Sequence, residues 1–324
     1  MSIPAHVFRA YDVRGLVDVD LTPDFAHALG TAIGSEVVAQ GGTQMAVGFD
    51  ARASGPSLAG ALIEGLCSTG LDVRCIGCVA TPHLYHAVMH GELGGGVMVT
   101  GSHNPPEYNG FKIMVGKNSL HGEGIQRLLA RITQGDVVVA DQPGQRVDVD
   151  ALAAYQDDVL QRLKPLERPL KVVIDAGNGC GGLAGPVLRA MGAEVVELYC
   201  DADPSFPNHH PDPTVEENLE DLKAAVLAHG ADLGVAFDGD VDRIGAVDET
   251  GAVIWGDLLT LLFARAILKD RPNAVIIGEV KCSQLLYQGI ADAGGVPVMW
   301  KAGHSLIKAK MKETGAVLAG EMSG

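Results

Sequence analysis

Apolar runs of strand length alternate with amphipathic stretches of helix length along most of the chain. In the first half, the runs at 45–49, 72–76, 96–100 and 111–115 have strand character, and 57–69 has the apolar spacing of a helix. This alternation predicts helices that cover a sheet, which is α/β layering.

The pattern restarts twice, after a polar stretch at 136–150 that contains Pro143-Gly144 and reads as a connection between domains. The second part predicts helices at 149–163, 182–191 and 219–229 and strands at 171–174, 194–199 and 233–237. The third predicts helices at 257–268, 283–293 and 305–314 and strands at 274–277, 296–300 and 317–319. We therefore expect three α/β domains, at 1–148, 149–252 and 253–324.

Composition narrows the class of protein. The chain has 324 residues and a net charge of −16, and this excess of carboxylates argues against nucleic acid or an anionic membrane as a partner. The start has no signal-peptide core, and the longest apolar run, 258–268, is shorter than the roughly 18 to 20 residues of a membrane span. Six scattered cysteines suit reduced thiols. We expect a cytoplasmic protein.

A hydroxyl-bearing loop follows the expected strand at 96–100. It reads Thr100-Gly101-Ser102-His103-Asn104-Pro105-Pro106. A turn or helix-cap serine is the default interpretation of Ser102. An imidazole beside it and two prolines that stiffen the loop favour a nucleophile. Lys112, on the next expected strand, would return across a hairpin to supply a positive charge or a proton.

An acidic loop follows the expected strand at 233–237. Asp238, Asp240 and Asp242 alternate in it, and Arg243 comes next. With Glu249, the aspartates also match positions of an EF-hand loop, but Arg243 stands where that loop needs glycine and the flanks are strand-like. A solvated turn without metal is a further alternative. We favour a Mg²⁺ site, with Arg243 near the metal to hold phosphoryl oxygens. A serine, a metal site and cations together suit phosphoryl transfer.

Two other motifs offer competing interpretations. The run 177–182 matches G-x-G-x-x-G between a strand and a helix, so a dinucleotide-dependent enzyme is the main rival. A dinucleotide-dependent enzyme would leave the serine loop and the acidic loop unexplained. The glycines are also accounted for by a tight turn between a strand and a helix. His86 and His90 share a helical face and would suit zinc, but no carboxylate stands between them, so ordinary surface histidines are expected.

The chain resembles the α-D-phosphohexomutases, and within them the bacterial phosphomannomutase/phosphoglucomutase group. The matching runs span the chain in the family's order and lie at 8–15, 100–112, 238–243, 301–305 and 320–324. The resemblance implies mixed sheets around a central cleft, with a phosphoserine loop, a metal-binding loop and a sugar-recognition loop in successive domains. It also implies reversible conversion of hexose 1-phosphate and hexose 6-phosphate through a hexose 1,6-bisphosphate.

The resemblance assigns roles to particular residues. Ser102 would carry the phosphoryl group and bind Mg²⁺ together with the three aspartates, and Lys112, His103 and Arg14 would line the reacting centre. Residues expected to hold the phosphorylated hexose are Arg243, Lys281, His304, Glu321 and Ser323. A monomer is expected.

Two departures from the family pattern bear on these expectations. Val241 stands where the family usually has glycine. The chain also stops at Gly324 directly after an expected strand, so we expect a truncated third domain and no C-terminal family domain. An inactive fragment that binds phosphosugar or metal is therefore an alternative to a working enzyme.

Overall fold

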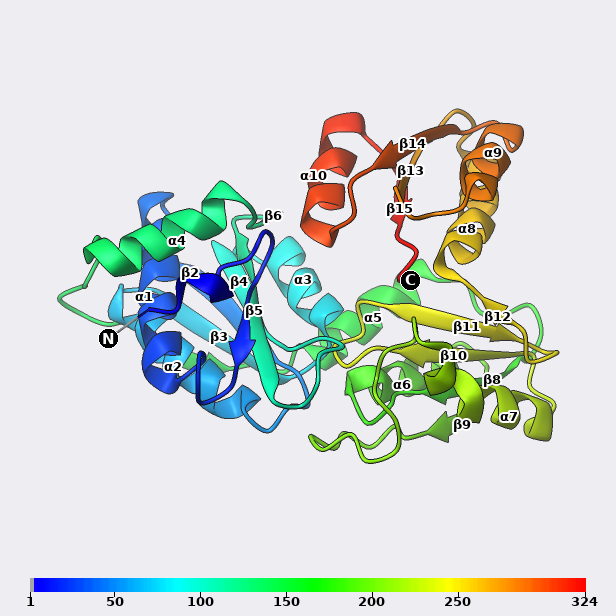
Figure 1. Ribbon diagram of the computed structural model, residues 1–324, viewed down its shortest axis with the longest axis horizontal. Coiled ribbons are helices and arrows are strands. Elements are labelled where there is room, and N and C mark those ends of the chain that lie inside the picture. The colour runs from blue at the N-terminus through cyan, green and yellow to red at the C-terminus, as the bar shows by residue number, and fades with distance from the viewer. Residues whose placement is uncertain (1–2) are drawn as a thin grey trace.

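The computed structural model describes residues 3–324 and forms three α/β lobes, each around its own sheet (Figure 1). Met1 and Ser2, the first two residues of the expected first domain, lie outside the described residues. In the part that is described, no helix combines the length and apolar character needed to cross a membrane.

The first sheet has the strand order β1-β5-β4-β2-β3-β7, with β6 paired to β5. β5 runs antiparallel to β1 and β4, whereas β4, β2, β3 and β7 are parallel, so the sheet is mixed. The strands are β1 (Val13–Leu16), β2 (Gln44–Phe49), β3 (Asp72–Cys78), β4 (Gly95–Val99), β5 (Tyr108–Val115), β6 (Asn118–Ser119) and β7 (Arg146–Asp148).

Helices cover both faces of this sheet. One face packs against α1 (Pro23–Ala39), α2 (Gly55–Ser68) and α4 (Glu123–Gln134), which contribute Phe25, Leu62 and Leu128 to the larger core. The other face packs against α3 (Thr81–His90) through Leu84 and Val88. A short 3₁₀ helix, Ala5–Val7, precedes β1.

The expected connection at 136–150 needs correction, because β7 lies within it. Arg146–Asp148 pairs in parallel with β3 and extends the first sheet. All three residues of β7 are exposed, so this edge strand lacks the apolar alternation that would have revealed it.

The second sheet has the order β12-β11-β10-β8-β9, with β10 parallel to β8 and antiparallel to β11. Its strands are β8 (Lys171–Asp175), β9 (Glu194–Leu198), β10 (Leu233–Phe237), β11 (Ile244–Asp248) and β12 (Val253–Ile254). Its helices are α5 (Leu152–Arg162), α6 (Gly185–Ala190) and α7 (Glu220–His229), with 3₁₀ turns at Cys180–Ala184 and Glu216–Leu219. Because β12 pairs with β11, this sheet continues past residue 252 and the third lobe starts after Ile254.

The third sheet has the order β14-β13-β15 and is parallel throughout its described strands, so the expectation of mixed sheets does not extend to it. Its strands are β13 (Val275–Glu279), β14 (Val296–Trp300) and β15 (Leu318–Gly320), and its helices are α8 (Gly256–Asp270), α9 (Gln284–Asp292) and α10 (His304–Thr314). In Figure 1, α10 reaches toward the first lobe, and the C-terminal end of the chain lies beside β11. Residues of the loops that follow β4, β10, β14 and β15 line one cavity.

Candidate active site

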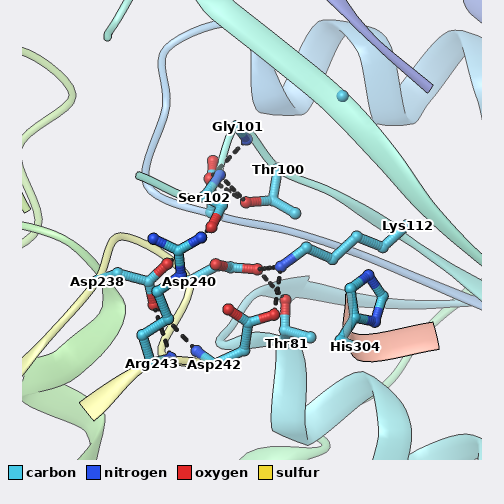
Figure 2. Close-up of polar contacts among 12 residues, drawn as sticks. Thr81, Thr100, Gly101, Ser102, Lys112, Asp238, Asp240, Asp242, Arg243 and His304 are labelled. Carbon is cyan, nitrogen blue, oxygen red and sulfur yellow. Dashed lines mark hydrogen bonds and ion pairs between the residues drawn. The ribbon is translucent and has the colours of Figure 1, made fainter. Parts of the chain in front are cut away.

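Ser102 lies in the turn that follows β4 and is almost fully buried. Its backbone has a φ of 50°, a left-handed conformation that non-glycine residues adopt rarely. The Ser102 amide donates a hydrogen bond of 2.8 Å to Thr100 Oγ1, and its hydroxyl donates one of 2.7 Å to Asp238 Oδ2. The loop therefore holds the hydroxyl against the acidic loop of the second lobe (Figure 2).

Arg52 holds the serine loop in its conformation through hydrogen bonds to the loop backbone. This role was not predicted from the sequence. The buried guanidinium of Arg52 donates to the backbone carbonyls of Ser102, Asn104, Pro105 and Tyr108 at 2.5–2.9 Å. A Cβ on Gly101 would lie 2.4 Å from Arg52 Cζ, so only glycine allows this close approach. The position of Arg52 shortly after β2 was the one sequence signal for this contact. β2 and β4 are parallel neighbours, so residues that follow them lie at the same edge of the sheet.

Asp238 organises the acidic loop while it contacts the serine. Its Oδ1 accepts hydrogen bonds from the backbone amides of Asp242 and Arg243, at 3.0 and 3.1 Å. Burial, followed by the charge of Asp240, raises the pKa of the Asp238 carboxyl well above its usual value. A cation bound next to this carboxyl would therefore stabilise its ionised form.

Lys112 joins the two lobes at the base of the site. Its Nζ lies 2.6 Å from both Asp240 Oδ2 and Asp242 Oδ2. Burial opposes the charge on Lys112, but the two carboxylates outweigh it and raise its pKa well above the usual value. Thr81, at the start of α3, adds a second link that the sequence analysis missed, since its hydroxyl donates to Asp240 Oδ2 and its amide to the Asp240 carbonyl.

The three aspartates fit a hard divalent cation. Each offers a carboxylate oxygen, and these oxygens lie within 4.8 Å of one another. Asp240 Oδ1 is buried and has no hydrogen-bond partner among the described residues. A buried carboxylate oxygen without a partner is costly, and a metal ion would satisfy it. An all-oxygen donor set of this kind suits Mg²⁺.

The glycine turn at 177–182 packs against the acidic loop. A Cβ on Gly179 would lie 2.8 Å from Gly239 Cα, and the Cys180 amide donates to the Gly239 carbonyl at 3.0 Å. The expected helix at 182–191 is instead a 3₁₀ turn followed by the short α6. The Gly239 backbone occupies this face of the turn, which argues against the dinucleotide interpretation.

A cavity of about 440 Å³ opens above the two loops. Ten of the residues predicted from the sequence line it: Arg14, Ser102, His103, Lys112, Asp242, Arg243, Lys281, His304, Glu321 and Ser323. Asp238 and Asp240 are fully buried and do not line it. Tyr11, Thr214 and Trp255 also line the cavity and were not predicted.

The cavity concentrates positive charge in an acidic protein. Arg14, Lys112, Arg243 and Lys281 line it, against the carboxylates of Asp242 and Glu321. Arg14 is held by Asp12 at 2.5 Å, and the Arg243 guanidinium lies 3.7 Å from Asp212. Such an arrangement suits a phosphorylated ligand.

Two histidines in the cavity are held neutral. Burial, and then the charge of Arg243, lowers the pKa of His103 to about 4. Burial, and then the charge of Lys308, lowers the pKa of His304 to about 3. His103 Nδ1 lies 3.2 Å from the Ser102 hydroxyl, so a neutral imidazole stands beside the candidate nucleophile.

Two loops of the third lobe also line the cavity. His304 is the first residue of α10 and packs edge-on against Tyr11 of the first lobe. Glu321 Oε1 accepts a hydrogen bond of 2.8 Å from the Gly303 amide, which joins the loop after β14 to the loop after β15. Residues of all three lobes therefore meet at one cavity.

Comparison with known proteins gives one consistent family. Models of the phosphoglucomutase/phosphomannomutase alpha/beta/alpha domains I, II and III match residues 5–136, 153–251 and 255–324. A phosphomannomutase/phosphoglucomutase of Pseudomonas aeruginosa is 51% identical over 324 residues, which cover 100% of this chain and 69% of the relative.

Solved structures agree. A phosphoglucomutase/phosphomannomutase family protein from Burkholderia thailandensis aligns with a TM-score of 0.96 at 45% identity, over 100% of this chain and 72% of that chain. Two structures of N-acetylphosphoglucosamine mutase from Aspergillus fumigatus share the fold. The complex with GlcNAc-6P and magnesium has a TM-score of 0.55 at 15% identity, over 92% and 65% of the two chains. The complex with glucose 1,6-bisphosphate has 0.56 at 14%, over 100% and 68%.

Proposed function

The chain belongs to the phosphoglucomutase/phosphomannomutase family, and from this premise we propose how its residues interconvert hexose 1-phosphate and hexose 6-phosphate. It is a phosphohexomutase, an intramolecular phosphotransferase of the isomerase class. The observation that carries the assignment of roles is the hydrogen bond between the Ser102 hydroxyl and Asp238, at the floor of a cation-lined cavity.

Ser102 is the residue that carries the phosphoryl group. Among the described residues that line the cavity, Ser102 has the only hydroxyl that makes a hydrogen bond to the acidic loop. In the first half-reaction, the bond between phosphorus and Ser102 Oγ breaks while a sugar hydroxyl oxygen forms a new bond to phosphorus. The second half-reaction is the reverse, with the other phosphate of the sugar.

Asp238, Asp240 and Asp242 would hold Mg²⁺, together with an oxygen at Ser102. The free Oδ1 of Asp240 and the all-oxygen donor set support this choice. When bound, the ion would offset charge on the phosphoryl oxygens. The Aspergillus mutase complex with magnesium is consistent with this assignment.

Lys112 is the proton carrier. The Lys112 ammonium, which lines the cavity between the two loops, would donate a proton to Ser102 Oγ as the bond of that oxygen to phosphorus breaks. The neutral amine left behind would accept the proton of the sugar hydroxyl. Neutral His103, 3.2 Å from Ser102 Oγ, orients that hydroxyl. Arg14 and Arg243 hold the phosphoryl oxygens by charge-assisted hydrogen bonds.

The remaining cavity residues recognise the phosphorylated hexose. Lys281 and His304 approach its phosphate, and Glu321 and Ser323 accept or donate hydrogen bonds at sugar hydroxyls. Contacts at hydroxyls other than C2 would let the site accept both glucose and mannose. The intermediate would be a hexose 1,6-bisphosphate that turns around before the phosphoryl group returns to Ser102, in line with the Aspergillus complex that contains glucose 1,6-bisphosphate.

An intact-mass measurement tests the central assignment. Protein treated with glucose 1,6-bisphosphate should gain one phosphate, and Ser102→Ala should gain none and lose turnover while it keeps its circular dichroism spectrum. Normal turnover of the alanine variant would refute the role of Ser102.

A coupled assay started with the bisphosphate separates turnover from the alternative of binding alone.

The expected cytoplasmic location and monomeric state stay predictions, which cell fractionation and size-exclusion chromatography would check.

A further inference from the structure

His86 and His90 stand one helical turn apart on α3. Their rings stack with centroids 4.4 Å apart and an interplanar angle of 27°. Neither residue lines the cavity above Ser102. Positions i and i+4 of a helix lie on the same face, so both imidazoles are directed to one point.

A carboxylate from another helix lies at that point. Asp158 on α5 brings its Oδ2 to 3.3 Å from His86 Nε2 and to 4.0 Å from His90 Nε2. One ligand atom from each of the three residues lies within 4.8 Å of the others. We propose that His86, His90 and Asp158 form a binding site for a transition-metal ion of the zinc type, which ties α3 to α5.

The distances suit such an ion with little movement. Zinc binds nitrogen and oxygen ligands at about 2.0–2.2 Å in a tetrahedral arrangement. Two ligand atoms at that distance stand roughly 3.3 Å apart. The contact of His86 with Asp158 already has this spacing, and His90, whose side chain is half exposed, is free to close the longer one.

His86 Nε2 gives an independent reason for a ligand. It is buried and makes no hydrogen bond in the described residues, since its contact with Asp158 does not have hydrogen-bond geometry. A buried polar atom without a partner is costly, and metal coordination would satisfy it. The ring is also held in place, because Tyr155 of α5 packs edge-on against it, with ring centroids 5.4 Å apart.

The donor set distinguishes this site from the aspartate loop. Two imidazoles and one carboxylate favour zinc, cobalt, nickel or copper, whereas Mg²⁺ prefers oxygen ligands alone. Arg162 competes for Asp158, since its Nε donates to both carboxylate oxygens at 2.8 Å. The Arg162 side chain of this ion pair is exposed to solvent. Exposed ion pairs of this kind contribute little to stability.

The ion would have a structural role at a lobe boundary. α3 belongs to the first lobe, and its first residue, Thr81, holds Asp240 of the acidic loop. α5 precedes the second sheet, and all but its first residue lies in the segment that matches family domain II. A metal between the two helices would therefore restrict the relative movement of the lobes that supply Ser102 and the aspartates.

Cobalt titration tests the site. Protein stripped with a chelator and saturated with Mg²⁺ should bind one equivalent of Co²⁺ with the visible absorption of four- or five-coordinate cobalt. His90→Ala and Asp158→Asn should each bind at least tenfold more weakly. His27→Ala, at an exposed histidine of α1, is the matched control and should behave as the wild type.

Thermal unfolding in Zn²⁺ gives a second readout. The wild-type Tm should rise with Zn²⁺ concentration, and the Tm of His90→Ala should not, because only an ion that binds the folded state stabilises it. With Mg²⁺ present and no added Zn²⁺, the turnover of His90→Ala should match the wild type. Equal Co²⁺ affinity in the wild type and both site variants would overturn the proposal, as would six-coordinate cobalt spectra alone.

Discussion

The hydroxyl of Ser102 donates a hydrogen bond of 2.7 Å to Oδ2 of Asp238, a residue 136 positions further along the chain. Ser102 follows β4 and Asp238 follows β10, and each of these strands pairs in parallel with a neighbour in its own sheet. The other oxygen of Asp238 accepts the two amides that shape the acidic loop. One carboxylate therefore links the candidate nucleophile to the backbone of the candidate metal site.

Replacement of Asp240 by asparagine should weaken Mg²⁺ dependence. The change removes one of the three carboxylate charges and places an amide where a buried oxygen now lacks a partner. We expect the Mg²⁺ concentration for half-maximal turnover to rise about tenfold or more, by analogy with the loss of other groups around bound metals. Asp141→Asn, at an exposed position, is the control. A titration that coincides with the wild type would show that the loop is not the ligand.

Replacement of Lys112 by methionine should make stability depend on Mg²⁺. The ammonium is almost fully buried and lies 2.6 Å from both Asp240 and Asp242. Without it, the two carboxylates lack their cation, which should cost about 3 kcal/mol of unfolding free energy in the absence of metal.

Added Mg²⁺ should restore much of that loss, so the Tm of Lys112→Met should rise further with Mg²⁺ than that of the wild type, while turnover is lost. Differential scanning calorimetry with and without Mg²⁺ measures both shifts. Equal shifts in the two proteins would contradict competition between Lys112 and the metal for the same oxygens.

The loops that carry the chemistry could be predicted from the sequence, but the residues that hold them in place could not. Ser102 and the aspartates follow apolar strands directly, and such positions gather at a sheet edge whatever the details of packing. Arg52 and Thr81 act through partners 50 and 159 positions away. Arg52 reaches its loop because β2 and β4 are neighbours in the first sheet. Thr81 reaches Asp240 because the first and second lobes meet. No local spacing in the sequence reveals either contact.

The same limit applies to the histidine pair. A carboxylate between His86 and His90 in sequence was the expected sign of a metal site, and none is there. The carboxylate that approaches them comes from Asp158 on α5, and its position depends on the packing of α5 against α3. The edge strand β7 was missed for a different reason, because its exposed residues carry no apolar pattern.

Replacement of Val241 by glycine should stabilise the protein. Val241 has a φ of 62°, and a β-branched side chain in this left-handed region is strained by about 1–3 kcal/mol. Glycine relieves the strain but costs about 0.5–1 kcal/mol of chain entropy. We expect a net gain of about 1 kcal/mol in unfolding free energy, measured by urea denaturation. Val241→Ala, which keeps the Cβ, should gain less. A loss of stability in the glycine variant would show that Val241 packing outweighs its backbone strain.

Replacement of His209 by glutamine should lower stability more in acid than in alkali. His209 Nε2 lies 3.0 Å from both oxygens of the fully buried Asp175. Burial works against the charged imidazole, but the hydrogen bond and charge of Asp175 outweigh it and raise the pKa of His209 above its usual 6.5. A raised folded-state pKa means that the pair stabilises the protein fully below pH 6.5 and loses this contribution as pH rises through the folded-state value.

The difference in unfolding free energy between the wild type and His209→Gln should therefore be largest near pH 6 and shrink toward pH 9, measured by urea denaturation at each pH. His27→Gln, at an exposed histidine, should show no such trend. A difference for His209→Gln that stays constant with pH would mean that the imidazole is neutral in the folded state and contributes through packing alone. Because Asp175 also accepts the amide of Gly177, in the glycine turn beside the acidic loop, the same titration reports on the support beneath the candidate metal site.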